Sequence, residues 1–110
     1  MASAGPSVLV LYESFAVATV VVHRLLDFPM VHMVRSDRVE ECADDYDAIV
    51  VDPYVREAGI VTVLRRWAGT PVIELCDLGR GAGARVLSGP AHSRPGDAVL
   101  AALGFQAVAV

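Results

Sequence analysis

Short, continuous apolar runs recur along this chain and are separated by segments with other periodicities. The clearest run is Ala48-Ile49-Val50-Val51, which Asp47 precedes and Asp52 follows. Unbroken rather than alternating apolar residues are typical of strands that are buried on both faces. The predicted strands are residues 8–11, 30–34, 47–52, 71–76 and 84–87.

The segments between these runs predict helices. Apolar residues spaced i, i+3, i+4 and i+7 mark one over 56–68, which Gly69 ends. Ser14 is placed to cap another that ends before Pro29, and Ser36 or Asp37 to cap a short acidic one. The predicted helices are residues 15–26, 36–43, 56–68 and 93–103.

Strands that alternate with helices indicate an α/β fold, a three-layer sandwich around five mostly parallel strands. The fourth helix of that pattern is expected to be reduced or missing, because only eleven residues separate Cys76 from Ser88. Such a link is short for a parallel crossover, so either it crosses as coil or the fifth strand is displaced. Residues 7–104 form the expected domain, 1–6 a loose leader and 105–110 a tail or extra strand.

Composition limits the classes of function. The chain has 110 residues, 55% of them hydrophobic, and a net charge of -4, which suits one domain with a single core. Its basic residues are scattered, so nucleic-acid binding by this domain alone is not expected. Cys42 and Cys76 lie far apart, which does not support a zinc site. No apolar stretch suits a membrane span or a signal peptide, and a cytoplasmic location is expected.

The carboxyl ends of parallel strands are where such sheets carry functional residues. We therefore expect the functional site at one edge of the sheet. The residues that follow or close the predicted strands are Tyr12, Glu13, Ser36, Asp37, Asp52, Cys76, Asp77 and Ser88.

On these residues the chain, from about 8 to 103, resembles the receiver domains of response regulators. The segment DAIVVD is similar to the family's third strand, which places Asp52 at the phosphoacceptor position. The resemblance implies a flavodoxin-like fold with strand order 2-1-3-4-5. It also implies two adjacent acids after the first strand, where this chain has Tyr12 and Glu13. The switch positions after strands four and five correspond to Cys76, Ser88 and Gly89.

The differences from the family pattern fall on the groups that phosphoryl transfer uses. Tyr12 replaces one Mg²⁺-binding acid, Cys76 replaces a hydroxyl donor, and Gly89 stands where the family has a lysine. Phosphoryl transfer needs a metal and a cation to offset charge on the phosphoryl oxygens. Two carboxylates seldom make a tight site, so we expect no cofactor beyond weak Mg²⁺ binding at Glu13 and Asp52.

We therefore expect a receiver-like signalling module that is not an enzyme. It would act through protein–protein contact, as a homodimer or with another protein, without aspartyl phosphorylation. Two alternatives remain open. One is an atypical phosphoacceptor at Asp52, and the other is a small-anion or nucleotide binder that uses the glycine-rich segment Gly79–Gly83.

Overall fold

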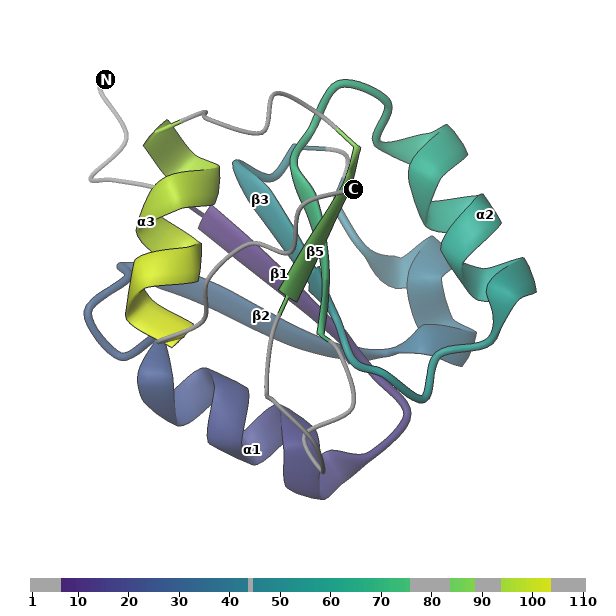
Figure 1. Cartoon of the computed structure of the whole chain (residues 1–110). Helices are drawn as coiled ribbons and strands as arrows, with labels where there is room; N and C mark the ends of the chain where they lie inside the picture. The colour runs from purple at the N-terminus through teal and green to yellow at the C-terminus, as the bar shows by residue number, and fades with distance from the viewer. Residues whose placement is uncertain (1–6, 44, 76–83, 89–93, 104–110) are drawn as a thin grey trace.

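A single five-stranded sheet forms the centre of the molecule (Figure 1), in the order β2-β1-β3-β4-β5. The computed structural model describes residues 7–43, 45–75, 84–88 and 94–103. The strands are β1 (Ser7–Tyr12), β2 (Met30–Arg35), β3 (Ala48–Val51), β4 (Val72–Leu75) and β5 (Ala84–Ser88). The first four are parallel, which confirms the predicted order 2-1-3-4.

Helices cover both faces of this sheet. Figure 1 shows α1 and α3 on one side and α2, with the short helix before β3, on the other. The helices are α1 (Phe15–Arg24), the 3₁₀ helix η1 (Ser36–Glu41), α2 (Glu57–Arg66) and α3 (Arg94–Leu103). Each begins and ends within a few residues of its predicted bounds. The predicted leader and the C-terminal tail lie outside the described residues.

Alternation along the strands divides the core into two clusters. In β1, Val8 and Val10 pack with residues of α1 and α3, whereas Leu9 and Leu11 pack with residues of α2 and η1. Successive side chains of a strand point to opposite faces, so a strand with apolar residues at every position suits a sheet covered twice. All four of these residues are at most 1% exposed.

The fifth strand differs from the expectation. β5 lies beside β4 as predicted, but it runs antiparallel, with Leu75 opposite Ala84 and Val72 opposite Ser88. Of the two alternatives left open by the sequence, a coil that crosses the sheet to a parallel fifth strand is therefore wrong. An antiparallel neighbour starts where the previous strand ends, so the eight residues 76–83 need not cross the sheet. The antiparallel direction of β5 therefore removes the need for a helical crossover, for which this link is too short.

One arginine joins the two elements on the α2 face. The guanidinium of Arg66, at the end of α2, donates hydrogen bonds to the carbonyl oxygens of Val39 and Cys42. It also lies 4.6 Å from the ring centroid of the buried Trp67. Arg66 thus binds the carbonyl groups at the end of η1, where the Val39 carbonyl also accepts the amide of Cys42.

Among the described helices, none combines the length and the apolar character that a membrane span needs.

The direction of β5 can be tested by disulfide formation. With Cys42 and Cys76 replaced by alanine, Glu74→Cys and Arg85→Cys should form a disulfide, because these positions are directly opposite each other. Opposed residues of antiparallel strands have Cα atoms about 4.5–5.5 Å apart, within the range a disulfide spans. Glu74→Cys with Ser88→Cys should stay reduced under the same oxidant. Absence of the Glu74→Cys and Arg85→Cys disulfide in non-reducing electrophoresis would contradict the antiparallel register.

Candidate functional site

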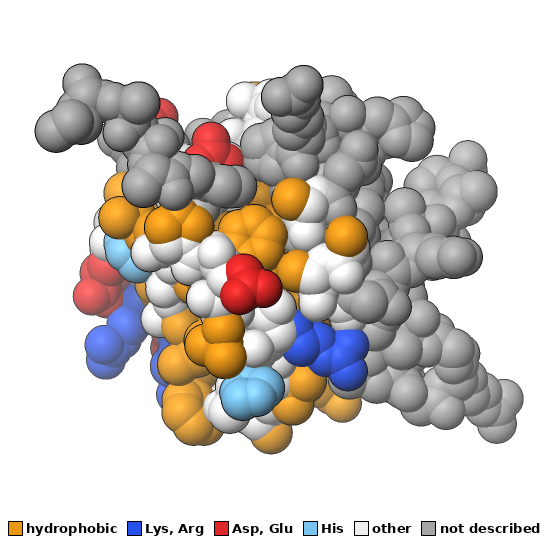
Figure 2. Space-filling view, turned by 90° about the vertical axis from the view of Figure 1, so that its left-hand side faces the viewer, with side chains coloured by type: hydrophobic (Ala, Val, Ile, Leu, Met, Phe, Trp, Pro, Cys, Tyr) orange, Lys and Arg blue, Asp and Glu red, His pale blue; other side chains and the backbone are white. Residues whose placement is uncertain are grey.

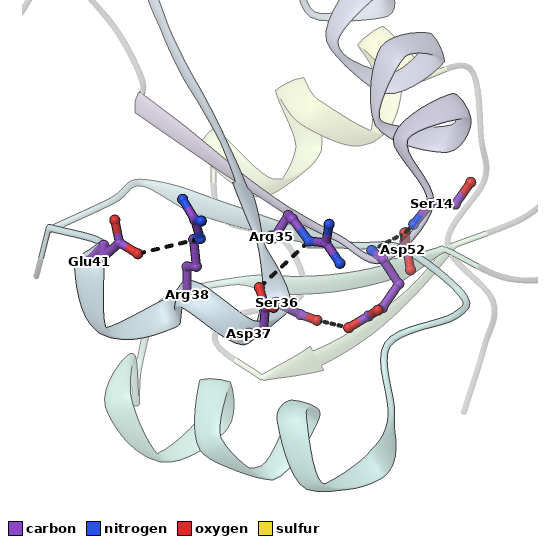
Figure 3. Close-up of polar contacts among 8 residues, drawn as sticks. Ser14, Arg35, Ser36, Asp37, Arg38, Glu41 and Asp52 are labelled. Atoms are coloured by element: carbon purple, nitrogen blue, oxygen red, sulfur yellow. Dashed lines mark hydrogen bonds and ion pairs between the residues drawn. The ribbon is translucent and has the colours of Figure 1, made fainter.

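The candidate site lies at the carboxyl ends of β1 and β3, where the strand order of the sheet reverses. From β1 the chain passes through α1 to β2 on one side, and then crosses to β3 on the other side. Such a switch point is where parallel α/β sheets commonly bind ligands. Asp52 follows β3 at this point, and the β1–α1 loop of Glu13 and Ser14 faces it (Figure 3).

Asp52 is fully enclosed, with 1% of its surface exposed, and it is the one buried charged side chain among the described residues. Its Oδ2 accepts hydrogen bonds from the backbone amides of Glu13, at 2.7 Å, and Ser14, at 2.8 Å. Its Oδ1 accepts one from the amide of Tyr54, at 2.8 Å. Both carboxylate oxygens are therefore bound by backbone donors from two loops. This is how a buried carboxylate replaces its lost hydration.

The local sequence explains this arrangement. Pro53 has no amide hydrogen, so the first amide that Oδ1 can reach after Asp52 is that of Tyr54, two residues on, as in an Asx turn. The backbone of Asp52 continues the sheet, since its amide donates to the carbonyl of Leu11 at 3.1 Å. On the facing loop, the side chain of Ser14 caps α1 by accepting from the amide of Val17.

Glu13 contributes its backbone rather than its carboxylate. Its amide binds Asp52, while its exposed side chain accepts a hydrogen bond from the hydroxyl of Ser36 at the start of η1 (Figure 3). Tyr12 is half-buried, and its ring packs edge-on against that of Phe15 with centroids 6.0 Å apart. The two predicted acidic positions, Glu13 and Asp52, are thus neighbours in space, and the contact between them joins the Glu13 amide, not its carboxylate, to Asp52.

Of the other predicted positions, Ser36 reaches this site through Glu13, whereas Ser88 does not. Ser88 pairs with Val72 at the amino end of β4, so the strand that was expected to bring it to the carboxyl edge instead leads away. Its grouping with Asp52 is therefore corrected, and the cause is the antiparallel direction of β5. Cys76, Gly89 and the glycine-rich segment Gly79–Gly83 lie outside the described residues.

Within the described part of the chain, no group of three or more His, Cys, Asp or Glu side chains is placed to hold a metal ion. The oxygens of Asp52 already accept three amide hydrogens, and the carboxylate of Glu13 is directed to Ser36. The carboxylate of Asp52 is therefore an anion of the protein itself that binds the amides of the β1–α1 loop. In many α/β proteins, amides at this kind of position bind the anionic group of a ligand.

A second polar cluster lies on the α2 face, and the sequence pattern did not indicate it. The ring Nδ1 of His32 lies 3.1 Å from the hydroxyl of Tyr46, and the Tyr46 ring packs edge-on against Trp67. Burial raises the pKa of the neighbouring Cys42 thiol and that of the Tyr46 phenol. The raised pKa values keep both groups protonated near neutral pH, which suits a packing role.

Comparison with known proteins found no matching family model, no similar curated protein and no similar solved structure.

Replacing Asp52 should test its role as a buried acceptor. Asp52→Asn retains one acceptor oxygen but turns an amide group toward a backbone donor, so we expect the free energy of unfolding to fall by about 1–3 kcal/mol. Urea denaturation measures this change. Asp47→Asn is the matched control, because Asp47 precedes β3 and binds Ser7 from an exposed position. Equal stability of Asp52→Asn and the parent chain would contradict the assigned role.

Stability should also decrease at alkaline pH. Burial raises the pKa of Cys42 above its ordinary 9.0 and that of Tyr46 above its ordinary 10.0, so the unfolded chain loses these protons first. The free energy of unfolding should therefore be unaffected by these groups at neutral pH and fall as pH rises through 9.0 and beyond. Denaturation at several pH values, with Cys76→Ala throughout, measures the profile. Adding Cys42→Ala should delay the onset; an unchanged onset would exclude the thiol as its cause.

Proposed function

We propose that this domain is a receiver-like signalling module of flavodoxin-like fold. It acts through contact with another protein or a second copy, and does not use aspartyl phosphorylation. The parallel order β2-β1-β3-β4 and the position of Asp52 after β3 support the likeness in fold. The molecule is not proposed to be an enzyme.

The state of Asp52 carries this proposal. A phosphoacceptor carboxylate attacks phosphorus with a free oxygen, in reach of solvent and of a metal ion. Asp52 is 1% exposed, and each of its oxygens accepts at least one amide hydrogen. Phosphorylation would have to break these bonds and open the edge of the sheet. The carboxylate is better suited to hold two loops in place than to react.

The charges around Asp52 argue in the same direction. An aspartyl phosphate adds nearly two negative charges, which need a cation nearby. The chain contains no lysine anywhere, so no other lysine can substitute for the one absent at Gly89. Tyr12 occupies the position of one metal-binding acid, and Glu13 interacts with Ser36.

The two alternatives have less support. An atypical phosphoacceptor at Asp52 would need the buried carboxylate to become exposed. A binder of small anions or nucleotides at the switch point would have to displace Asp52 from the amides of Glu13 and Ser14. The glycine-rich segment Gly79–Gly83, on which the second alternative depends, lies outside the described residues.

Treatment with Mg²⁺ and acetyl phosphate, or with Mg²⁺ and beryllofluoride, tests the independence from phosphorylation. Intact-mass spectrometry should show no phosphate on Asp52, and tyrosine and tryptophan fluorescence should show no saturable change. A receiver domain with its full set of acids is the positive control for the reagents. Stoichiometric incorporation that Asp52→Glu abolishes would make the domain an ordinary switch and refute the proposal.

Self-association is the second test. The apolar segment 105–110, FQAVAV, is proposed to contribute to an interface with a second copy. Sedimentation velocity over a range of concentrations should show a dimer that weakens when the chain is ended at Gly104. A monomer at every concentration would eliminate the homodimer and leave a different protein as the partner.

A further inference from the structure

Exposed apolar side chains are concentrated on α1, the turn after it and β2. Seven large hydrophobic side chains are exposed in the described part of the chain, and five of them belong to this region. Figure 2 shows hydrophobic side chains gathered on the side of the molecule where α1 ends and β2 begins. The five are Phe15, Val20, Leu26, Met30 and Met33, with Leu26 the most exposed at 68%.

A mostly apolar hollow of about 310 Å³ lies between α1 and β2, and we call it the α1–β2 hollow. Phe15 and Leu26 line it together with Met33 of β2. Its lining residues are Phe15, Thr19, Val22, His23, Leu26 and Met33. The hollow is large enough for one apolar side chain of another molecule, and burying such a side chain is favourable.

A second hollow, of about 290 Å³, adjoins the first at the carboxyl end of β2, and we call it the arginine hollow. Met33 lines both hollows, and the ring contact between Tyr12 and Phe15 joins their walls. Its lining residues are Tyr12, Met33, Val34, Arg35, Arg38 and Glu41. The two hollows are neighbours that share Met33, the first mostly apolar and the second lined by charged side chains, and we refer to the pair as the groove.

The charged end of the groove has two guanidinium groups and one carboxylate in its lining, and each guanidinium has a carboxylate partner. Arg35 pairs with Asp37 at 3.6 Å, and Arg38 pairs with Glu41 at 3.8 Å (Figure 3). All four side chains are more than half exposed, and ion pairs of this kind contribute little to stability. An acidic group from another molecule can therefore bind here at small cost.

The groove runs beside the edge strand of the sheet. β2 pairs with β1 on one side, and no described strand pairs with its other side. Its sequence, MVHMVR, lacks the lysine, proline and inward-facing acid that usually protect an edge from pairing. Met33 and Arg35 are two residues apart, so they lie on the same face of β2. Met33 lines both hollows, whereas Arg35 lines the arginine hollow.

We propose that β2 and this groove bind an extended segment of a partner protein. An apolar side chain of that segment enters the α1–β2 hollow, and an acidic side chain about two residues away pairs with Arg35 and Arg38. This inference rests on the proposed function as an interaction module. A second copy fits less well, because β2 itself contains no acid that could pair with Arg35 and Arg38.

Selection from a library of random displayed peptides against the whole domain tests this inference. Enriched peptides should combine large apolar residues with an acid two residues away. A fluorescein-labelled copy of the most enriched peptide then reports affinity by polarisation. Met33→Ser, which alters both hollows, and Arg35→Glu should each weaken binding about tenfold or more. Replacing the peptide's acid by lysine should restore binding to Arg35→Glu, which loss of fold cannot do.

The matched controls lie on α2. Val61→Ser and Arg65→Glu change an exposed apolar and an exposed basic side chain, and each should leave the peptide's affinity within about twofold. Failure to enrich any peptide, or binding that Met33→Ser and Arg35→Glu do not affect, would overturn the groove proposal. In the second case the domain would remain an interaction module that uses another surface. A dimer that Met33→Ser dissociates would also overturn it, because a second copy would then occupy the groove.

Discussion

The hydrogen bonds to Asp52 fix the geometry of the carboxyl edge of the sheet. A buried carboxylate is tolerated only when donors replace the water it has lost. Here those donors are amides from the β1–α1 loop and from the loop after β3, so two connections that are distant in sequence have a fixed relative position. At the other end of β3, Asp47 binds the backbone and hydroxyl of Ser7. A carboxylate at each end of β3 therefore binds backbone amides of another segment, in addition to the ladder that pairs β3 with β1.

The sequence predicted the elements well because each depends on a local pattern. The run from Ala48 to Val51 became β3, and Ser14 caps α1. The Val20-Val21-Val22 triplet has strand propensity, yet it lies within α1, because its position between two strands of a parallel sheet requires a crossover. The direction of β5 was not predicted, since an apolar pattern is the same read in either direction. Only the length of the link before β5, which is short for a parallel crossover, indicated a displaced strand.

The site was predicted in part. Asp52 and Glu13 do lie at one edge, but the atoms that meet are the carboxylate of one and the backbone amide of the other. The identity of a side chain does not determine which backbone amides lie close together, so this contact could not be predicted from residue types. Ser88 was misplaced because its position follows from the direction of β5. The groove of Tyr12, Met33 and Arg35 was missed because its residues come from separate elements and form no motif.

The two bonds from Arg66 have a consequence for local motion. They join the end of α2 to carbonyl groups of η1, across 27 and 24 residues of sequence. When the last turn of α2 frays, the carbonyls of Val39 and Cys42 lose these donors at the same moment. The two elements should therefore open as one cooperative unit, with similar protection of their amides from hydrogen exchange. The 3₁₀ helix, too short to persist by itself, would then have the lifetime of the helix to which Arg66 connects it.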